Sequence, residues 1–224
     1  MIKFKKLIRK KTEKQLIREF ISEFIKYTVR KERQKKRFSF VVTGGASPIN
    51  LYKSLSKAKI NWKNIDLFWS DERFVKRKSK DSNYQLVQKY LIKKINIKKK
   101  NIYPVDTNKK SLNSSIINYE NKINNYFKKK KISFDLILIG MGLDGHIASI
   151  FPNNINLNTK KICSSVIRKD FKRISLNLRY INYSKKIILW LSNKKKSNIY
   201  KKIKNNRKIP VNYLNKKKLF IFTV

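Results

Sequence analysis

The chain of 224 residues contains a single cysteine, Cys163, and a single histidine, His146. One cysteine excludes a disulfide within the chain, and its scarcity fits a reducing compartment best. One histidine, one cysteine and only 13 acidic residues provide no recognisable set of ligands at metal-binding spacing. The composition therefore argues against a structural zinc site and against metal-assisted catalysis.

Long hydrophobic runs are also missing. Lys, Arg or Asn interrupts every apolar stretch before it reaches the roughly 18 residues of a membrane-spanning helix. The amino-terminal residues 1–15 are basic, but they lack the apolar core and the small-residue cleavage site of a secretory signal. We therefore expect these residues to belong to the mature chain, and we expect a soluble, cytoplasmic protein without a membrane partner.

Acidic residues are few relative to basic ones. The 13 Asp and Glu stand against 57 Lys and Arg, which gives a formal net charge of +44. Such an excess is typical of proteins that bind nucleic acid or anionic membranes, but here lysine recurs in nearly every segment instead of one stripe or tail. Glycine and proline are scarce while Lys, Asn and Ile dominate, which indicates the coding bias of an AT-rich genome. We expect no specific nucleic-acid partner, and we expect non-specific polyanion binding only as an incidental consequence of the charge.

The sequence does contain enough apolar residues, 41% of the chain, to form a substantial core. Short apolar runs alternate with segments in which apolar residues recur at helical spacing. The predicted strands are 38–43, 65–69, 101–107 (a short strand and turn), 134–142, 162–167, 173–178, 186–192 and 219–224, and the predicted helices are 13–29, 48–55, 82–92, 111–127 and 194–204. The near-continuous hydrophobicity of residues 134–142 indicates burial on both faces, which is typical of a parallel sheet. This alternation predicts one α/β domain over residues 1–224, with a mainly parallel central sheet flanked by helices.

Three loops at the carboxyl ends of predicted strands carry the unusual residues, and ligands of open α/β sheets bind at this edge. The loops are residues 44–48 (GGASP), 70–75 (SDERFV) and 142–149 (GLDGHIAS). In the first loop the glycine pair allows close backbone approach, and the following helix start offers free N–H groups to a phosphate. It lacks the Lys-Ser/Thr of a Walker motif and the third glycine of a dinucleotide fingerprint, so we expect no nucleotide hydrolysis. A tight turn without a ligand is the alternative.

The second loop places Asp71, Glu72 and Arg73 at the end of an apolar strand. An arginine at this edge can contact phosphate bidentately while a neighbouring carboxylate orients it. In a chain this poor in acids, two adjacent carboxylates favour a functional site over the alternative, a surface cluster of salt bridges.

The third loop sets His146 two residues after Asp144. This pair suits a general base, since an imidazole titrates near neutral pH and a carboxylate can fix its tautomer. A structural or solvated histidine is the alternative. Ser149 is not in a nucleophile-elbow pattern and Cys163 lies in a predicted strand, so water is the expected nucleophile.

Four segments, GGASP (44–48), WSDER (69–73), SNY (82–84) and GMGLDGHIASIFP (140–152), follow one another along the chain. Their order and spacing resemble the 6-phosphogluconolactonase family, and the similarity covers the chain from about residue 38 onward. The resemblance implies a Rossmann-like α/β fold and hydrolysis of 6-phospho-D-glucono-1,5-lactone to 6-phosphogluconate in the oxidative pentose phosphate pathway. It also implies that the reaction needs no metal and no organic cofactor.

The related glucosamine-6-phosphate deaminase and isomerase branch shares this fold and the Asp-Gly-His core, and it is the alternative. That branch has Asp-Glu-Tyr at the positions of residues 71–73 and Ala-Phe-Asn-Glu-Pro at those of residues 148–152. This chain has Asp-Glu-Arg and Ala-Ser-Ile-Phe-Pro there, so both positions favour the lactonase. A basic nucleic-acid-binding protein on the same scaffold is the non-enzymatic alternative.

The resemblance further implies roles for individual residues. His146 activates the water, Asp144 orients its imidazole, and backbone N–H groups of residues 44–47 or 142–146 stabilise the oxyanion. The expected substrate-binding residues are Gly44, Gly45, Ser47, Asp71, Arg73, Gly145, Arg173 and Lys196. Among these, the arginines, the lysine and the glycine turn hold the phosphate. The expected partner is the sugar-phosphate lactone, and a monomer is the default.

Two positions depart from the family's pattern. Ala46 stands where the family usually has serine, and Asn193 stands where a glycine usually precedes the phosphate-binding lysine. With Asn193 in place of glycine, the turn at residues 192–196 can differ in shape from that of the family. Which lysine of the adjacent trio binds the phosphate is left open by the sequence: Lys194, Lys195 or Lys196.

Overall fold

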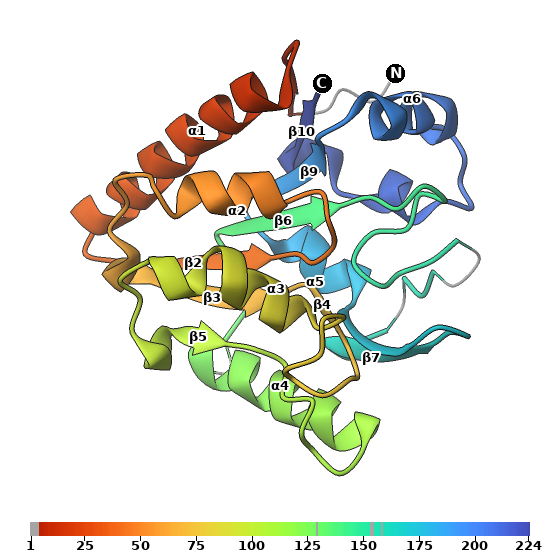
Figure 1. The fold of residues 1–224 in the computed structure, drawn as a ribbon. Coiled ribbons are helices and arrows are strands. Elements are labelled where there is room, and N and C mark those ends of the chain that lie inside the picture. Colours follow the sequence, from red (N-terminus) through yellow and green to blue (C-terminus); the bar gives the residue numbers. More distant parts are fainter. Residues whose placement is uncertain (1–4, 129, 153–154, 158) are drawn as a thin grey trace.

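The computed structural model describes residues 5–128, 130–152, 155–157 and 159–224, so the first four residues of the basic amino-terminal segment lie outside the described part. Within these residues, seven strands form one sheet in which every neighbouring pair is parallel (Figure 1). In order across the sheet the strands are β1 (Lys6–Arg9), β10 (Leu219–Thr223), β9 (Ile187–Leu191), β6 (Leu136–Gly140), β2 (Phe38–Val42), β3 (Ile65–Trp69) and β5 (Ile102–Tyr103). The predicted α/β fold with a mainly parallel central sheet is confirmed.

The centre of this sheet is buried on both faces. Every residue of β2, β3 and β9 is buried. Strands covered by helices on both faces read as continuous apolar runs, which is why the sequence located them. The edge strand β1 differs, because Ile8 is the one buried residue among its four. Such a short basic segment shows no apolar run, and the sequence predicted no strand there.

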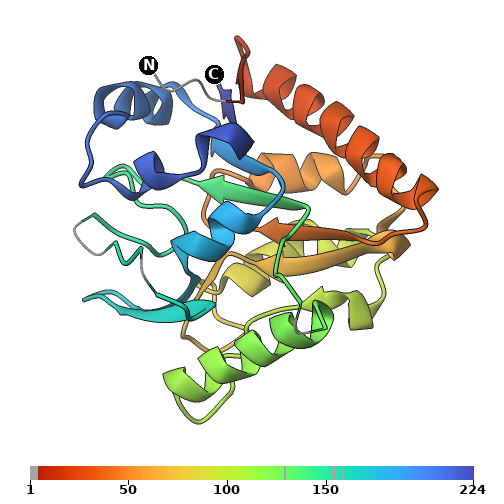
Figure 2. The same ribbon diagram turned by 180° about the vertical axis from the view of Figure 1, so that it is seen from behind.

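Helices cover both faces of the sheet. In the described residues they are α1 (Glu13–Arg33), α2 (Ile49–Leu55), α3 (Asn83–Tyr90), α4 (Leu112–Tyr126), α5 (Leu178–Tyr183) and α6 (Lys194–Ile203). α2 and α3 lie in front of the sheet in Figure 1, whereas α4 and α5 come to the front in Figure 2. In α1 the buried Leu16, Phe20 and Phe24 recur every four residues, as the predicted helix requires. The Thr12 hydroxyl caps this helix by accepting a hydrogen bond from the Gln15 N–H.

A second, antiparallel sheet was not predicted. Its strands, in order, are β4 (Asp71–Arg73), β8 (Lys172–Leu176) and β7 (Cys163–Ile167). Ser70 joins the two sheets, because its N–H donates to the Val42 carbonyl in the large sheet and its carbonyl accepts from the Leu176 N–H in the small one. The sequence indicated strands at the positions of β7 and β8 but treated β4 as part of a loop. Three residues are too few to show a period.

An ion cluster around the buried Asp135 connects elements at the opposite, amino-terminal edge of the sheet. The Asp135 carboxylate, just before β6, lies 2.6 Å from Lys31 Nζ of α1 and 2.9 Å from Lys185 Nζ. It also accepts hydrogen bonds from the N–H and the hydroxyl of Ser39 in β2. Burial opposes ionisation, but the hydrogen bonds from the lysines and Ser39 outweigh it and lower the pKa of Asp135. The cluster therefore links α1, β2 and the start of β6.

All seven parallel strands end at the same edge, so the loops that follow them are neighbours in space. β2 leads into the glycine turn, β3 leads through Ser70 into β4, and β6 leads into the loop that carries His146. α6 begins at this edge too, directly after β9. In the described part of the chain, we find no helix that combines the length and apolar character needed to cross a bilayer.

Candidate active site

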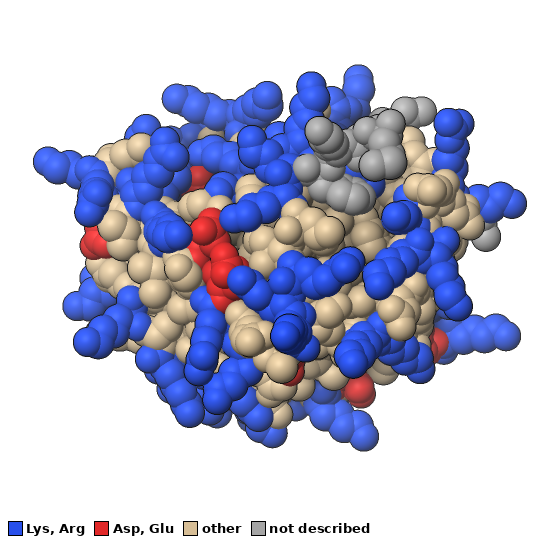
Figure 3. All heavy atoms as spheres, turned by 90° about the horizontal axis from the view of Figure 1, so that it is seen from above, with Lys and Arg blue, Asp and Glu red and all other residues tan. Residues whose placement is uncertain are grey.

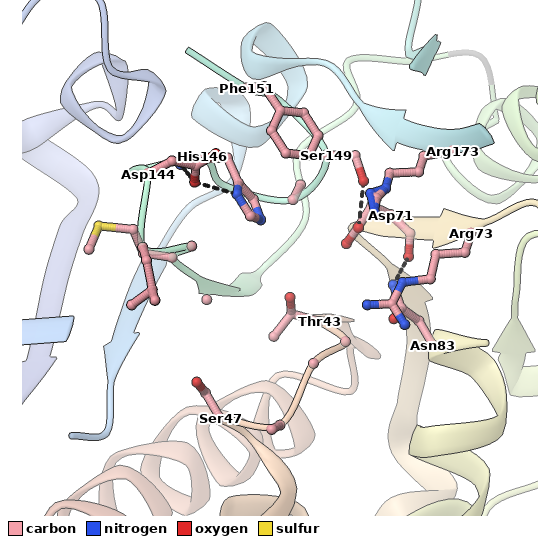
Figure 4. Close-up of a pocket in the computed structure, with 18 of the residues that line it drawn as sticks. Thr43, Ser47, Asp71, Arg73, Asn83, Asp144, His146, Ser149, Phe151 and Arg173 are labelled. Atoms are coloured by element: carbon pink, nitrogen blue, oxygen red, sulfur yellow. Dashed lines mark hydrogen bonds and ion pairs between the residues drawn. The ribbon is translucent and has the colours of Figure 1, made fainter. Parts of the chain in front are cut away.

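A pocket with a volume of about 570 Å³ lies at this carboxyl edge (Figure 4). The glycine turn after β2, the loop after β6 and the small sheet with β4 and β8 form its walls. The residues expected from the sequence that line it are Gly44, Gly45, Ser47, Asp71, Arg73, Asp144, His146, Arg173 and Lys196. Segments far apart in the sequence therefore meet at one site.

Gly145 is the expected site residue that does not line the pocket. Its φ of +85° lies in the region that favours glycine, and an added Cβ would come within 2.3 Å of the Ile209 side chain. Its position therefore supports a role in shaping the loop that carries His146, and the expected substrate contact has no support in the geometry.

His146 and Asp144 form a pair on the loop after β6. The imidazole Nδ1 lies 2.6 Å from Asp144 Oδ1, and the His146 backbone N–H donates to the same oxygen at 3.1 Å. Partial burial opposes ionisation of Asp144, but these hydrogen bonds outweigh it and lower the pKa of its carboxyl. A carboxylate at Nδ1 fixes the neutral tautomer whose lone pair is on Nε2, and Figure 4 shows this second nitrogen pointing into the pocket. The pair has the geometry of a general base.

Two neighbours restrict the His146 ring. An added Cβ on Gly142 would come within 2.1 Å of Nδ1, and the Gly142 N–H donates to the His146 carbonyl at 2.9 Å. The Phe151 ring packs against the imidazole with 4.5 Å between ring centres. The loop therefore leaves the imidazole little freedom to rotate away from Asp144.

Two arginines face each other in the small sheet. Arg73 of β4 is the direct cross-strand partner of Arg173 in β8, and both guanidinium groups lie within 5.5 Å of the Phe171 ring centre. Arg73 also donates to the Asp81 carbonyl at 2.9 Å. Figure 4 shows the two side chains on the same side of the pocket, across from His146. Like charges at directly opposed positions destabilise a sheet, so this pair suits a site that binds an anion.

A lysine from α6 adds a third cation. Lys196 Nζ donates to the Ser47 hydroxyl at 2.7 Å, and burial lowers the pKa of this ammonium group. Lys194 and Lys195 are exposed and do not line the pocket. Of the three adjacent lysines, the fold brings Lys196 to the site.

Asn193, a departure from the family's pattern, begins α6. Its backbone is extended with a φ of −142°, a conformation that any residue adopts. Its side-chain oxygen accepts a hydrogen bond from the Lys196 N–H at 2.9 Å, so it caps the helix. The asparagine therefore replaces the glycine without strain and places Lys196 in the first turn.

Close contacts shape the glycine turn after β2. Gly45 has a φ of +81°, which favours glycine. An added Cβ on Gly44 would come within 1.8 Å of Asn83 Oδ1, because the Asn83 side chain packs against this turn. Asn83 Nδ2 donates to the Asp71 carbonyl at 2.9 Å. Asn83 therefore connects the glycine turn to β4.

The adjacent carboxylates of β4 have different surroundings. Asp71 lines the pocket and accepts a hydrogen bond from the Ser149 hydroxyl at 2.8 Å. Glu72 is buried, and accepts hydrogen bonds from two backbone N–H groups and one hydroxyl at the start of α3. Burial raises the pKa of Glu72 to about 7. Glu72 therefore anchors α3, and Asp71 and Arg73 are the polar residues of β4 that reach the pocket.

The pocket also contains side chains that the sequence analysis did not mark as site residues: Thr43, Asn83, Phe151, Arg168 and Asp170. Asn83 and Phe151 belong to the SNY and GMGLDGHIASIFP segments, and this membership was a usable signal. Arg168 and Asp170 lie in the turn between β7 and β8, which carries no such segment. In the part of the chain described, no three His, Cys, Asp or Glu side chains gather as a metal-binding group.

A Rossmann-like sheet that presents a histidine–aspartate pair across from a group of cations defines an acid–base enzyme with an anionic substrate. The chain belongs to the family of glucosamine-6-phosphate isomerases/6-phosphogluconolactonase, whose model matches residues 11–221. The family membership expected from the sequence is thereby confirmed.

Individual relatives carry the name of one branch of this family. The chain is 32% identical to the 6-phosphogluconolactonase of Haemophilus influenzae over 170 residues, which cover 72% of this chain and 71% of the relative. It is 29% identical to the 6-phosphogluconolactonase of Thermotoga maritima over 209 residues, or 92% and 93% of the two chains. The crystal structure of a Thermotoga maritima 6-phosphogluconolactonase superposes with a TM-score of 0.85 at 25% identity, over 98% of this chain and 99% of that one.

Proposed function

We propose that the chain hydrolyses 6-phospho-D-glucono-1,5-lactone to 6-phospho-D-gluconate, the second step of the oxidative pentose phosphate pathway. The observation that carries the proposal is one pocket with the His146–Asp144 pair on one side and Arg73 and Arg173 on the other. The substrate matches this arrangement, because it has a reactive carbonyl at one end for the His146–Asp144 pair and a phosphate dianion at the other for the arginines. The named relatives, all 6-phosphogluconolactonases, support the same reaction.

In the proposed mechanism, Nε2 of neutral His146 takes a proton from a water molecule, which attacks the lactone carbonyl. Asp144 keeps the other proton on Nδ1 and stabilises the imidazolium. The bond between the carbonyl carbon and the ring oxygen then breaks, and the imidazolium returns its proton to that oxygen. Backbone N–H groups of residues 44–47 or 142–146 hold the oxyanion before this collapse.

The cations bind the phosphate in this proposal. Arg73, Arg173 and Lys196 supply charge-assisted hydrogen bonds, and the Ser47 hydroxyl and the glycine turn complete the group. Anchoring this remote dianion lets binding energy place the carbonyl beside His146.

The deaminase and isomerase branch is not favoured. Arg73, which stands where that branch has tyrosine, forms half of the cross-strand arginine pair. Phe151 stands where that branch has glutamate, so at this position an apolar ring packs against His146 and adds no second carboxylate beside Asp144.

The proposal also takes residues 1–224 as one domain that acts as a monomer in the cytoplasm, with the lactone as its specific partner. One hydrophobic core cluster includes residues of both sheets, which supports a single domain. Cys163 is a free, buried thiol, which fits a reducing compartment. Figure 3 shows Lys and Arg side chains scattered across the visible face, between areas of other residues, and not gathered in one stripe, which supports the absence of a specific nucleic-acid site there.

The test generates the lactone in the cuvette and follows its disappearance against a blank, because such lactones also open spontaneously. The wild type should accelerate opening, His146→Ala should abolish the acceleration, and Arg73→Ala should chiefly raise KM. Circular dichroism confirms that each variant is folded. If the folded wild type only matches the blank, the proposal fails, and release of ammonia and fructose 6-phosphate from glucosamine 6-phosphate tests the other branch.

A further inference from the structure

The turn between β7 and β8, residues 168–171, reaches the pocket with two charged side chains that the proposed mechanism does not use. They are Arg168 and Asp170. The Arg168 N–H donates to the Phe171 carbonyl at 3.1 Å and closes the turn. Because the strands form an antiparallel hairpin, the turn brings Asp170 back to Arg173.

Asp170 and Arg173 form an ion pair in the pocket wall. One Asp170 oxygen contacts the guanidinium, and the other accepts the Phe171 N–H at 2.9 Å. Only 10% of the Arg173 side chain is accessible to solvent, against 55% of the Asp170 side chain. The arginine is therefore fixed in the wall, while the aspartate lies on its solvent side.

Arg173 has donor capacity that this pair does not use. Among the described residues its Nε is buried and has no hydrogen-bond partner. The Phe151 and Phe171 rings lie 5.5 Å from the guanidinium and limit its movement. A guanidinium binds best to an acceptor that engages two of its N–H groups, such as a phosphate. Asp170 commits one oxygen to its own turn and contacts Arg173 with the other.

We propose that Asp170 occupies the anion position on Arg173 while the pocket is empty, and that the phosphate of the substrate displaces it. The inference rests on the proposed function, which assigns Arg173 to the phosphate. Asp170 is then a specificity-determining residue, because every incoming anion must compete with a carboxylate that is tethered beside its site.

This competition raises the apparent dissociation constant of every anion that binds at Arg173. The apparent dissociation constant equals the intrinsic one divided by the fraction of molecules in which Asp170 has moved away. A weak monoanion then leaves the site largely unoccupied. A sugar phosphate still binds, because it brings two charges and reaches Arg73 and Lys196 as well.

Titration calorimetry with inorganic phosphate tests this without catalysis. Asp170→Asn keeps an oxygen for the Phe171 N–H but removes the charge that pairs with Arg173. We expect it to bind phosphate at least about threefold more tightly than the wild type, the scale of a half-exposed ion pair. Glu19→Gln is the matched control, since it removes a carboxylate that pairs with Lys10 and does not line this pocket. The control should retain the wild-type affinity.

A double-mutant cycle separates displacement from the general effect of removing a negative charge. In an Arg173→Gln background there is no ion pair to displace, so Asp170→Asn should change the phosphate affinity by less than about 1.5-fold. An equal gain in both backgrounds would overturn the proposal, and so would an unchanged or weakened affinity in Asp170→Asn alone. Thermal melting checks folding, and Arg173→Met, which also removes the charge, replaces the glutamine variant if that one does not fold.

Kinetics separate this inference from the function on which it rests. If the wild type does not hydrolyse the lactone, the proposed function fails, while the phosphate titrations still decide whether Asp170 competes for Arg173. If it does hydrolyse the lactone, Asp170→Asn should lower KM and leave kcat unchanged.

Discussion

Lys196 and Ser47, which are 149 residues apart in the chain, are joined by a hydrogen bond of 2.7 Å inside the pocket. The Ser47 carbonyl also accepts a hydrogen bond from the indole of Trp190 in β9. The lysine is thereby held against the glycine turn after β2, where we propose that the phosphate binds.

Replacing this lysine should weaken substrate binding. We expect Lys196→Met to raise KM about 10- to 100-fold with a smaller effect on kcat, because a hydrogen bond to a charged group contributes about 1.5–3 kcal/mol. Steady-state kinetics on the lactone measure both constants. Lys195→Met removes the same charge from the exposed neighbour and should behave as the wild type. An equal rise of KM in the two variants would contradict the assignment.

Gly142 should be intolerant of any side chain. We expect Gly142→Ala to lower kcat at least about tenfold, because the new Cβ would displace the His146 ring from the position it needs. The variant should remain folded by circular dichroism. Ala46→Ser restores the family's usual residue at an exposed position of the pocket and serves as the active control. Full activity of Gly142→Ala would show that the imidazole position is not required.

Removing the Asn193 cap of α6 should lower the stability of the protein. We expect Asn193→Ala to lower the free energy of unfolding by about 1 kcal/mol and Asn193→Asp to leave it close to the wild type, since aspartate caps a helix as well as asparagine. Urea unfolding followed by circular dichroism gives both values. If alanine and aspartate prove equal, the side chain of Asn193 does not cap the helix in solution.

The Asp135 cluster should make stability depend on pH. The pKa of Asp135 is lower in the folded protein than its ordinary value of 3.8. The stabilisation that the ionised carboxylate provides is therefore fully present above pH 3.8 and is lost as the pH falls through the folded pKa. We expect Asp135→Asn to lower the free energy of unfolding by about 1–3 kcal/mol near pH 7, because it leaves the largely buried Lys31 without its carboxylate while water can solvate the more exposed Lys185. Urea unfolding at pH 7, 5 and 3 should show the difference from wild type shrinking at the lowest pH. A difference that stays constant would contradict the assignment.

Local signals in the sequence located most of the fold. The strands β2, β3, β6 and β9 were predictable because complete or nearly complete burial leaves continuous apolar runs. β1 and β4 were not, since four and three residues bounded by charged neighbours carry no period. The pairing of Arg73 with Arg173 depends on the register of an antiparallel sheet, which no local pattern contains.

The candidate site also contains some residues whose placement was predictable from the sequence and others whose placement was not. His146 and Asp144 are two residues apart, so their pairing follows from a short loop and was predictable. The resemblance named Lys196 but left Lys194 and Lys195 open, because the choice depends on the direction in which α6 leaves β9. Gly145, which the resemblance placed at the substrate, does not line the pocket, and its positive φ and the nearby Ile209 side chain leave no room for a Cβ there.

The joint at Ser70 has a consequence for substrate length. His146 and the glycine turn follow strands of the large sheet, whereas the arginine pair belongs to the small one. The Ser70 N–H donates to the Val42 carbonyl, and the Leu176 N–H donates to the Ser70 carbonyl, so backbone hydrogen bonds hold the two sheets together. In the proposed binding mode, the distance between the reacting carbonyl and the phosphate therefore depends on a backbone connection between the two sheets. Lysines can therefore accumulate on the surface of this protein without changing the distance that the backbone connection at Ser70 sets between the two sheets.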